Sequence, residues 1–190
     1  MVAKAPAGPS ARERLLEAAN ELFYDEGVHT VGIDRVIERA GVAKASLYNT
    51  FGSKDELVRA YLEGRHARMA ARITRYLERY SDPRDRLLGV FEAQAELFAE
   101  EGFRGCAFVS ASAESPGQAV SRAADDYRGW VRGLLTSLAR EAGAADPEKL
   151  GRHLHMIYDG GSLAARMDRD PSSAAAARAA AETLLDAACR

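Results

Sequence analysis

Apolar residues recur along the chain at intervals of three and four, the spacing that places side chains on one face of an α-helix. No segment shows a convincing period-two alternation, the pattern of a half-buried strand. The first stripe consists of Leu15, Leu16, Ala18, Ala19, Leu22 and Phe23. A capping box formed by Ser10 and Glu13 precedes it, and Gly27 supplies a stop. The first helix is therefore expected between Ser10 and Gly27.

The same pattern predicts about eight more helices. A second helix carries Ile33, Val36, Ile37 and Ala40 on one face. A short helix follows at about 44–50, and a second capping box, Ser53 with Glu56, starts a long helix that reaches about Tyr80. The remaining helices are expected near 83–101, 106–114, 117–142, 147–167 and 171–188.

Proline placement supports these helix starts. Pro83, Pro147 and Pro171 each follow an aspartate, and Pro116 follows a serine. Aspartate and serine cap helices well, and proline suits the first helical position because its missing N–H would be unpaired there anyway. The fold class is therefore predicted to be all-α.

Residues 32–51, GIDRVIERAGVAKASLYNTF, carry the most specific pattern in the chain. A short amphipathic helix, a turn at Gly41 and a second short helix form a helix-turn-helix, whose second helix enters the major groove of DNA. The apolar residues expected to pack this pair onto the first helix are Val36, Ile37, Val42 and Leu47.

The stretch AGVAKASLYNTFGSKDELV resembles the tetracycline-repressor (TetR) family, and the similarity covers about residues 10–60. The matching positions are Phe23, Gly27, Ile33, Ala40, Gly41, Val42, Leu47, Tyr48, Phe51, Ser53 and Lys54. Ala43 departs from the family's usual capping Ser or Thr, and Ile37 stands where a small alanine is usual. The resemblance implies a homodimer that binds a two-fold symmetric double-stranded DNA operator. It also implies a pocket for a small-molecule effector in the C-terminal domain.

The predicted domains follow from this resemblance. Residues 1–9, rich in Ala, Pro and Gly, are interpreted as a disordered arm. The DNA-binding domain is expected at 10–57, with its helix-turn-helix at 32–51. An all-helical domain at 58–190 is expected to bind the effector and to dimerise. Its last two helices are the candidates for dimerisation, since Gly160, Gly161 and the alanines of 174–188 would allow helices to approach closely.

The expected recognition face lies on the third helix. Its residues are Lys44, Ala45, Ser46, Asn49 and Thr50. Lysine can donate to guanine, asparagine can pair with adenine, and the methyl groups of Ala45 or Thr50 can meet a thymine. The resemblance assigns phosphate contacts to Tyr48 and Lys54, which would set the register without reading sequence. The simpler interpretation of Tyr48 is a partly buried aromatic residue, and that of the other side chains is ordinary solvated surface.

Eight side chains are candidates to line an effector pocket. They are Phe91, Phe98, Cys106, Phe108, Tyr127, Trp130, Met156 and Tyr158. Their default interpretation is hydrophobic core, and a pocket made from them would favour a mostly apolar molecule. Cys106 follows Gly105 at an expected helix start beside Arg104, an environment that lowers the pKa of a thiol. A buried core cysteine is the alternative.

Composition sets further limits. The chain has 190 residues, 47% of them apolar, and a formal net charge of −2. Residues 1–60 contain eight basic and nine acidic residues, so the case for DNA rests on motif geometry and not on net charge. No apolar run approaches the roughly 18 residues of a membrane span, and the two cysteines form no framework. We therefore expect a cytoplasmic protein without a membrane partner.

Other functions and sites have less support in the sequence. The sequence shows no complete catalytic or metal-ligand spacing, so neither an enzyme nor a cofactor or metal site is expected; His155 and Asp159, one turn apart, are too few for a metal. Five arginines on one face of the long helix, between Arg65 and Arg79, are expected to form a solvated face with acidic neighbours. The open alternatives are an activator, a repressor that responds through Cys106, and an adaptor that has lost DNA binding.

Overall fold

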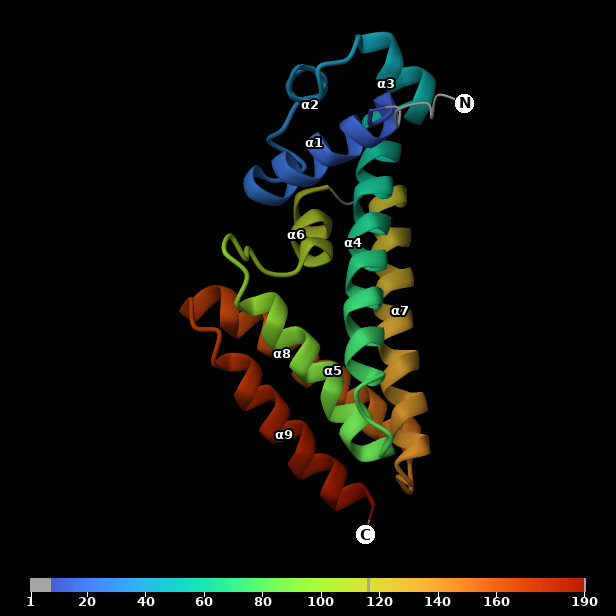
Figure 1. Ribbon diagram of the computed structural model, residues 1–190, viewed down its shortest axis with the longest axis vertical. Coiled ribbons are helices and arrows are strands. Elements are labelled where there is room, and N and C mark those ends of the chain that lie inside the picture. The colour runs from blue at the N-terminus through green and yellow to red at the C-terminus, as the bar shows by residue number, and fades with distance from the viewer. Residues whose placement is uncertain (1–7, 116, 190) are drawn as a thin grey trace, which may run out of the picture. The chain divides into compact units, whose positions relative to one another are not determined.

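The computed structural model describes residues 8–115 and 117–189, and within these ranges the chain forms nine helices (Figure 1). They are α1 (Ala11–Glu26), α2 (Ile33–Ala40), α3 (Lys44–Phe51), α4 (Lys54–Leu77), α5 (Pro83–Phe98), α6 (Ala107–Glu114), α7 (Gln118–Glu141), α8 (Pro147–Asp168) and α9 (Ser173–Ala188). The described part contains no strand, which confirms the all-α prediction. Most of the predicted arm, residues 1–7, lies outside the described residues.

The observed ends of the helices confirm most of the predicted helix caps. Ser10 and Glu13 form the predicted capping box, and Pro83 and Pro147 occupy first helical positions after capping aspartates. Pro171 does not start a helix: Asp170 accepts hydrogen bonds from Ser172 instead, and α9 begins two residues later than expected. The fourth and fifth helices each end three residues earlier than predicted, at Leu77 and Phe98. Pro116 lies outside the described residues.

The helices gather into two compact units. The first contains the described residues up to Gly64 together with Ala107–Ala123, and the second contains Arg65–Cys106 and Ala124 onward. The division is therefore less simple than the predicted boundary between residues 57 and 58. α6 belongs to the first unit, although it follows the first five helices and starts directly after a residue of the second.

The core of the first unit is formed where the apolar stripes of α1, α2 and α3 meet the start of α4. Leu15, Val36, Leu47 and Leu57 are all fully buried. Phe23 packs edge-on against Tyr61, with ring centroids 5.7 Å apart. Burial of these predicted stripe residues confirms that α2 and α3 pack onto α1.

α6 is joined to the first unit at the end of α1. The Glu114 carboxylate accepts a hydrogen bond from the backbone N–H of His29 at 3.1 Å, across 85 residues of sequence. Gly27 makes this approach possible, because a Cβ there would lie 2.5 Å from Glu114 Oε2. Its φ of +93° is also one that L side chains rarely adopt. Gly27 therefore serves both the helix stop and the docking of α6.

The second unit is built around α5, α8 and α9, with α9 running beside α8 and α5 (Figure 1). One face of α9, made of Ala174, Ala177, Ala181 and Leu185, is buried. Gly161 of α8 is buried as well. A Cβ there would lie only 3.0 Å from the Cβ of Ala177, so glycine allows α8 and α9 to approach closely at this point. Close approach at Gly161 is thus used within the chain, whereas Gly160 is exposed.

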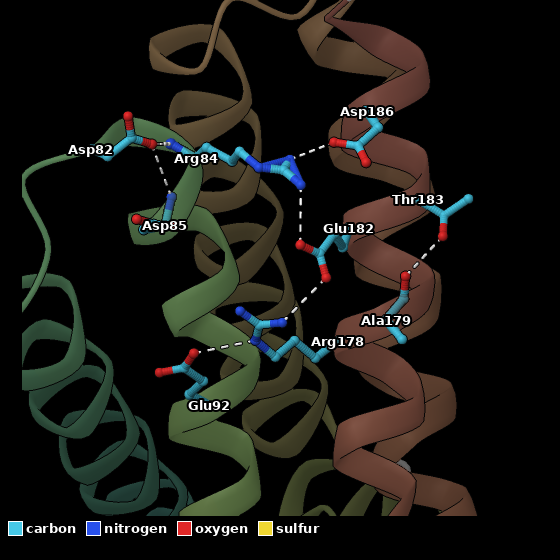
Figure 2. Close-up of polar contacts among 9 residues, drawn as sticks. All are labelled: Asp82, Arg84, Asp85, Glu92, Arg178, Ala179, Glu182, Thr183 and Asp186. Atoms are coloured by element: carbon cyan, nitrogen blue, oxygen red, sulfur yellow. Dashed lines mark hydrogen bonds and ion pairs between the residues drawn. The ribbon is translucent and has the colours of Figure 1, made fainter.

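A chain of charged side chains fixes α9 on α5 (Figure 2). Arg84 donates to Asp186 at 2.5 Å and to Glu182 at 3.1 Å. Glu182 also accepts from Arg178, which donates to Glu92 at 3.2 Å. Because each charged side chain in this series contacts partners of the opposite charge on the other helix or one turn away, a rotation or a one-turn slip of α9 would break several contacts at once.

None of the described helices is both long enough and apolar enough to cross a lipid bilayer.

Substituting Gly27 by alanine should lower the free energy of unfolding by about 2 kcal/mol or more, since a Cβ adds backbone strain and displaces Glu114. Urea denaturation would measure the loss. Gly52→Ala is the matched control, because Gly52 also has a positive φ (79°) but open space around its Cβ position. Equal losses for the two variants would show that Glu114 yields without cost.

Candidate functional site

The short helix α3 is held in place from one side only. Leu47 is fully buried against the first unit's core, and α2 ends at Gly41 in a left-handed conformation (φ 61°). The N–H of Val42 bonds back to Ile37 O at 3.3 Å, and Arg14 donates to Gly41 O at 3.1 Å. The turn is therefore fixed by its own backbone and by α1.

The opposite side of α3 faces outward, as predicted. Lys44, Ala45, Asn49 and Thr50 are exposed, Tyr48 is 45% exposed, and Ser46 is half-buried. The Thr50 hydroxyl donates to Ser46 O at 2.6 Å, which leaves its methyl group as the group free for an apolar contact. Ala43 occupies the N-cap position without a side-chain hydrogen bond, so the predicted missing cap is confirmed.

Lys54 is the first residue of α4 and is half-buried. Ser53 precedes it, and its hydroxyl accepts a hydrogen bond from the backbone N–H of Glu56 at 3.2 Å. The remaining N–H groups of this first turn and the Lys54 ammonium form a suitable setting for a phosphate.

The positively charged side chains of the first unit have different kinds of partner. Arg39 pairs with Glu21 at 2.6 Å, Arg35 pairs with Glu26, and the guanidinium of Arg12 lies 5.7 Å from the centroid of the Phe51 ring. Lys44 donates to Asp34 Oδ1 at 2.7 Å, and this hydrogen bond raises the pKa of the lysine. The Lys44–Asp34 contact was not predicted from the sequence, because the two residues lie on different helices.

A second group of candidate residues forms an aromatic cluster inside the second unit. The hydroxyls of Tyr127 and Tyr158 are 3.0 Å apart and buried, and Phe91 packs edge-on against Tyr158 with ring centroids 6.3 Å apart. Trp130 lies beside Tyr127, at 6.1 Å between ring centroids. Burial is the main cause that raises the pKa of both tyrosines; the nearby Cys106 thiol adds to the effect.

Two members of this cluster were missed from the sequence. The ring of His66 lies 5.5 Å from Tyr127 and 4.8 Å from Trp130, and burial lowers the pKa of this histidine. Gln94 is buried and donates to the backbone carbonyl of Tyr158 at 2.7 Å. A histidine or glutamine on a mixed helix face carries no periodic signal that marks it as buried.

The remaining candidates lie elsewhere. Phe98 is buried with Ala165 and Ala174 and packs on Phe103, Phe108 belongs to the first unit, and Met156 is 71% exposed on α8. The predicted pocket residues are therefore not one group. Five of them, Phe91, Cys106, Tyr127, Trp130 and Tyr158, come together.

Several charged residues outside these clusters have structural partners. Arg72 pairs with Glu96 at 3.0 Å and with Glu100, and Arg75 pairs with Glu96 at 2.7 Å, which confirms acidic neighbours for this part of the α4 face. The Arg72 side chain is only 17% exposed, so the prediction of a solvated face is wrong at this residue. His155 Nε2 lies 3.7 Å from Asp159 Oδ2. Across residues 8–115 and 117–189, no three His, Cys, Asp or Glu side chains are grouped to hold a metal ion.

The geometry of α2, the Gly41 turn and α3 is that of a helix-turn-helix, with an anchored helix that presents a polar outer face of the kind that reads base edges. The first unit is thus a DNA-binding module.

Comparison with known proteins identifies the family. The family model described as "Bacterial regulatory proteins, tetR family" matches residues 15–61. A crystal structure of a TetR-family transcriptional regulator from Streptomyces coelicolor is 35% identical, covers 95% of this chain and 96% of its own, and superposes with a TM-score of 0.88. The chain belongs to the TetR family and is a DNA-binding transcriptional regulator.

Two curated relatives are informative. The transcriptional repressor NemR of Escherichia coli is 29% identical over 83% of this chain and 85% of its own. A crystal structure of its reduced form has a TM-score of 0.78 at 26% identity, covering 92% of this chain and 97% of its own. The transcriptional activator FasR of Mycolicibacterium smegmatis is 40% identical, but the match covers only 43% of this chain and 37% of FasR.

Replacing Asn49 by alanine should change the preferred base at one position per half-site, because an exposed asparagine on this face can pair with adenine. Selection of bound duplexes from a random pool, performed with both proteins, would show the change. A uniform loss of affinity without a change in the selected sequence would contradict base reading by Asn49.

Replacing Lys54 by alanine should weaken binding to all duplexes about equally and reduce the dependence of log K on log salt by about one. Fluorescence anisotropy over a salt series measures both quantities. Lys149→Ala, an exposed lysine on α8 of the second unit, is the control and should leave both unchanged.

Proposed function

We propose that the protein is a dimeric repressor that binds a two-fold symmetric operator and releases it when a small molecule binds the second unit. The observation that carries this proposal is the anchoring of α3 through fully buried Leu47, which leaves Lys44, Tyr48 and Asn49 outward. A repressor is favoured over an activator because the NemR match spans most of both chains, whereas the FasR match is confined to a smaller part.

Selection from random DNA tests the first part of this proposal. The purified protein should enrich a sequence in which two half-sites are related by two-fold symmetry, about one helical turn apart or a multiple of it. Failure to enrich any sequence in low salt would overturn the proposal in favour of an adaptor. Loss of the gene should then raise transcription of flanking genes that carry the selected sequence, and a fall in transcription would assign an activator.

An exposed apolar face on α8 and α9 supports the dimer. Met156, Leu163 and Met167 are 71%, 59% and 70% exposed, and with the exposed Gly160 they are spaced four, three and four residues apart along α8. The exposed side of α9 adds small residues, namely Ala175, Ala176, Ala179, Ala180, Thr183 and Ala187. A large exposed apolar surface of this kind is typical of a protein interface. A second copy of the chain would cover it with two helices from each subunit.

Replacing Leu163 by glutamate should convert the dimer into a monomer, because the charge would be buried in the interface without a partner. Light scattering after gel filtration would measure the mass, and affinity for the selected duplex should fall at least tenfold. Val109→Glu is the matched control, since Val109 is a 51% exposed apolar residue on α6. A dimeric Leu163→Glu protein would place the interface elsewhere.

The aromatic cluster of the second unit is the proposed effector site. Phe91, Tyr127, Trp130 and Tyr158 supply apolar surface, and the paired tyrosine hydroxyls supply a polar group to orient a mostly apolar ligand. A ligand can regulate only through different affinities for the DNA-bound and the free arrangement of the protein.

Trp130 provides a direct assay for this site, because it is the only tryptophan of the chain. A panel of apolar compounds can be titrated against its fluorescence. A compound that binds the cluster should change the emission and lower affinity for the selected duplex. If compounds change the emission but leave the affinity for DNA unchanged, binding at this cluster does not regulate DNA binding.

A thiol-dependent response is the second candidate function. Cys106 directly precedes α6, and its thiol is near enough to raise the pKa of Tyr127 and Tyr158. NemR, for which a reduced form has been described, is a relative over most of the chain. Modification of Cys106 would place new atoms beside the tyrosine pair and at the start of α6, whose far end bonds the α1–α2 turn through Glu114.

Alkylation with N-ethylmaleimide should therefore weaken binding to the selected duplex at least tenfold in a Cys189→Ala protein, which retains Cys106 alone. The Cys106→Ser protein, which retains the exposed Cys189, should bind DNA normally and be insensitive to the reagent. Unchanged DNA affinity after complete modification, verified by mass spectrometry, would remove this candidate.

A further inference from the structure

Asp34 is an unexpected residue on the DNA-binding unit. It lies in the first turn of α2, its side chain is 82% exposed, and one of its carboxylate oxygens is 2.7 Å from the Lys44 ammonium at the start of α3. Since it touches a side chain of the recognition face, Asp34 shares that surface. A carboxylate there repels phosphates and weakens sequence-independent binding to DNA.

Fold stability does not explain the pair. Both side chains are more than half exposed, and ion pairs of this kind contribute little to stability. The other inter-helix pairs of the unit, Arg35 with Glu26 and Arg39 with Glu21, already join α2 to α1. The Lys44–Asp34 pair joins α2 to the recognition helix itself, so it acts on the position of a DNA-reading side chain.

We propose that Asp34 is a specificity-determining residue, which holds Lys44 toward a base edge and cancels its attraction to phosphates. An ammonium group has three N–H donors. One donor is used by Asp34 Oδ1, and two remain, which matches the O6 and N7 acceptors of a single guanine. An unrestrained lysine would bind any nearby phosphate equally well. The pair therefore lowers the affinity for non-specific DNA and increases the discrimination between bases at one position.

The proposal rests on DNA binding by the helix-turn-helix but not on the effector or on the sign of regulation. Two duplexes are needed: one with the sequence that the wild-type protein selects from a random pool, and a scrambled duplex of the same composition. The measured quantity is the ratio of the two dissociation constants, obtained by anisotropy across a salt series. If the wild-type protein selects no sequence, the proposed DNA recognition fails as a whole. If it selects one, the proposal on Asp34 is judged by the specificity ratios of the variants alone.

Asp34→Asn should bind the scrambled duplex about three- to tenfold more tightly, with a salt dependence steeper by about one, because the lysine charge becomes available to phosphate. Affinity for the selected duplex should change less, so the specificity ratio falls. Asp34→Ala, which also removes the acceptor oxygen, should lower the ratio further and relax the guanine preference at one position.

Two controls distinguish this role from a general effect of charge. Glu21→Gln removes the same charge and frees Arg39 from an inter-helix pair in the same unit, and it should leave the ratio within twofold of wild type. In a Lys44→Ala background, Asp34→Asn should no longer change the ratio. The proposal is overturned if Asp34→Asn leaves the ratio unchanged, if Glu21→Gln lowers it equally, or if the effect persists without Lys44.

Discussion

The one-sided anchoring of α3 is the constraint on which the DNA-binding unit depends. An eight-residue helix has little stability of its own, and here it also lacks a side-chain cap at Ala43. Its conformation is therefore imposed by Leu47 in the core, by the left-handed turn at Gly41 and by the bond from Arg14 to Gly41 O. The same packing that creates the helix also fixes which of its side chains face DNA.

The placement of individual charges on this unit explains how a protein with a net charge of −2 binds a polyanion. Two arginines of the unit, Arg35 and Arg39, are paired with carboxylates on α1, so their charges are partly cancelled and contribute less to the attraction of DNA. Lys54 stands at a helix start, where backbone N–H groups add to its charge. Binding is then governed by where a few charges lie, and overall composition carries little information about it.

The helices and the recognition face could be predicted because each depends on local signals. Capping boxes, first-turn prolines and three-four apolar spacing act within a few residues, and they located nine helices with small errors at the ends. The failure at Pro171 has the same origin: Asp170 bonds Ser172 in a turn, a local alternative that competes with capping.

Contacts between helices could not be predicted in this way. The partner of Lys44 is ten residues away on another helix, and that of the His29 N–H is 85 residues away. Met156 shows the same limit for apolar residues. An exposed apolar face and a face packed on the chain's own core present the same helical spacing, so the sequence grouped Met156 with Tyr158, although one is 71% exposed and the other is buried.

The two ends of α6 lie at Cys106 and at the Glu114 contact with the turn after α1. Its eight residues begin immediately after Cys106, whose thiol contributes to the raised pKa of the buried Tyr158, and end at Glu114, which bonds the turn after α1. Gly27 leaves room for the Glu114 carboxylate, which a Cβ at this position would displace. A short helix with one end tied to the turn that precedes α2 can shift little without changing that turn. Cys106 is therefore followed by eight residues of helix and then by the hydrogen bond that Glu114 accepts from the α1–α2 turn, which directly precedes the helix-turn-helix.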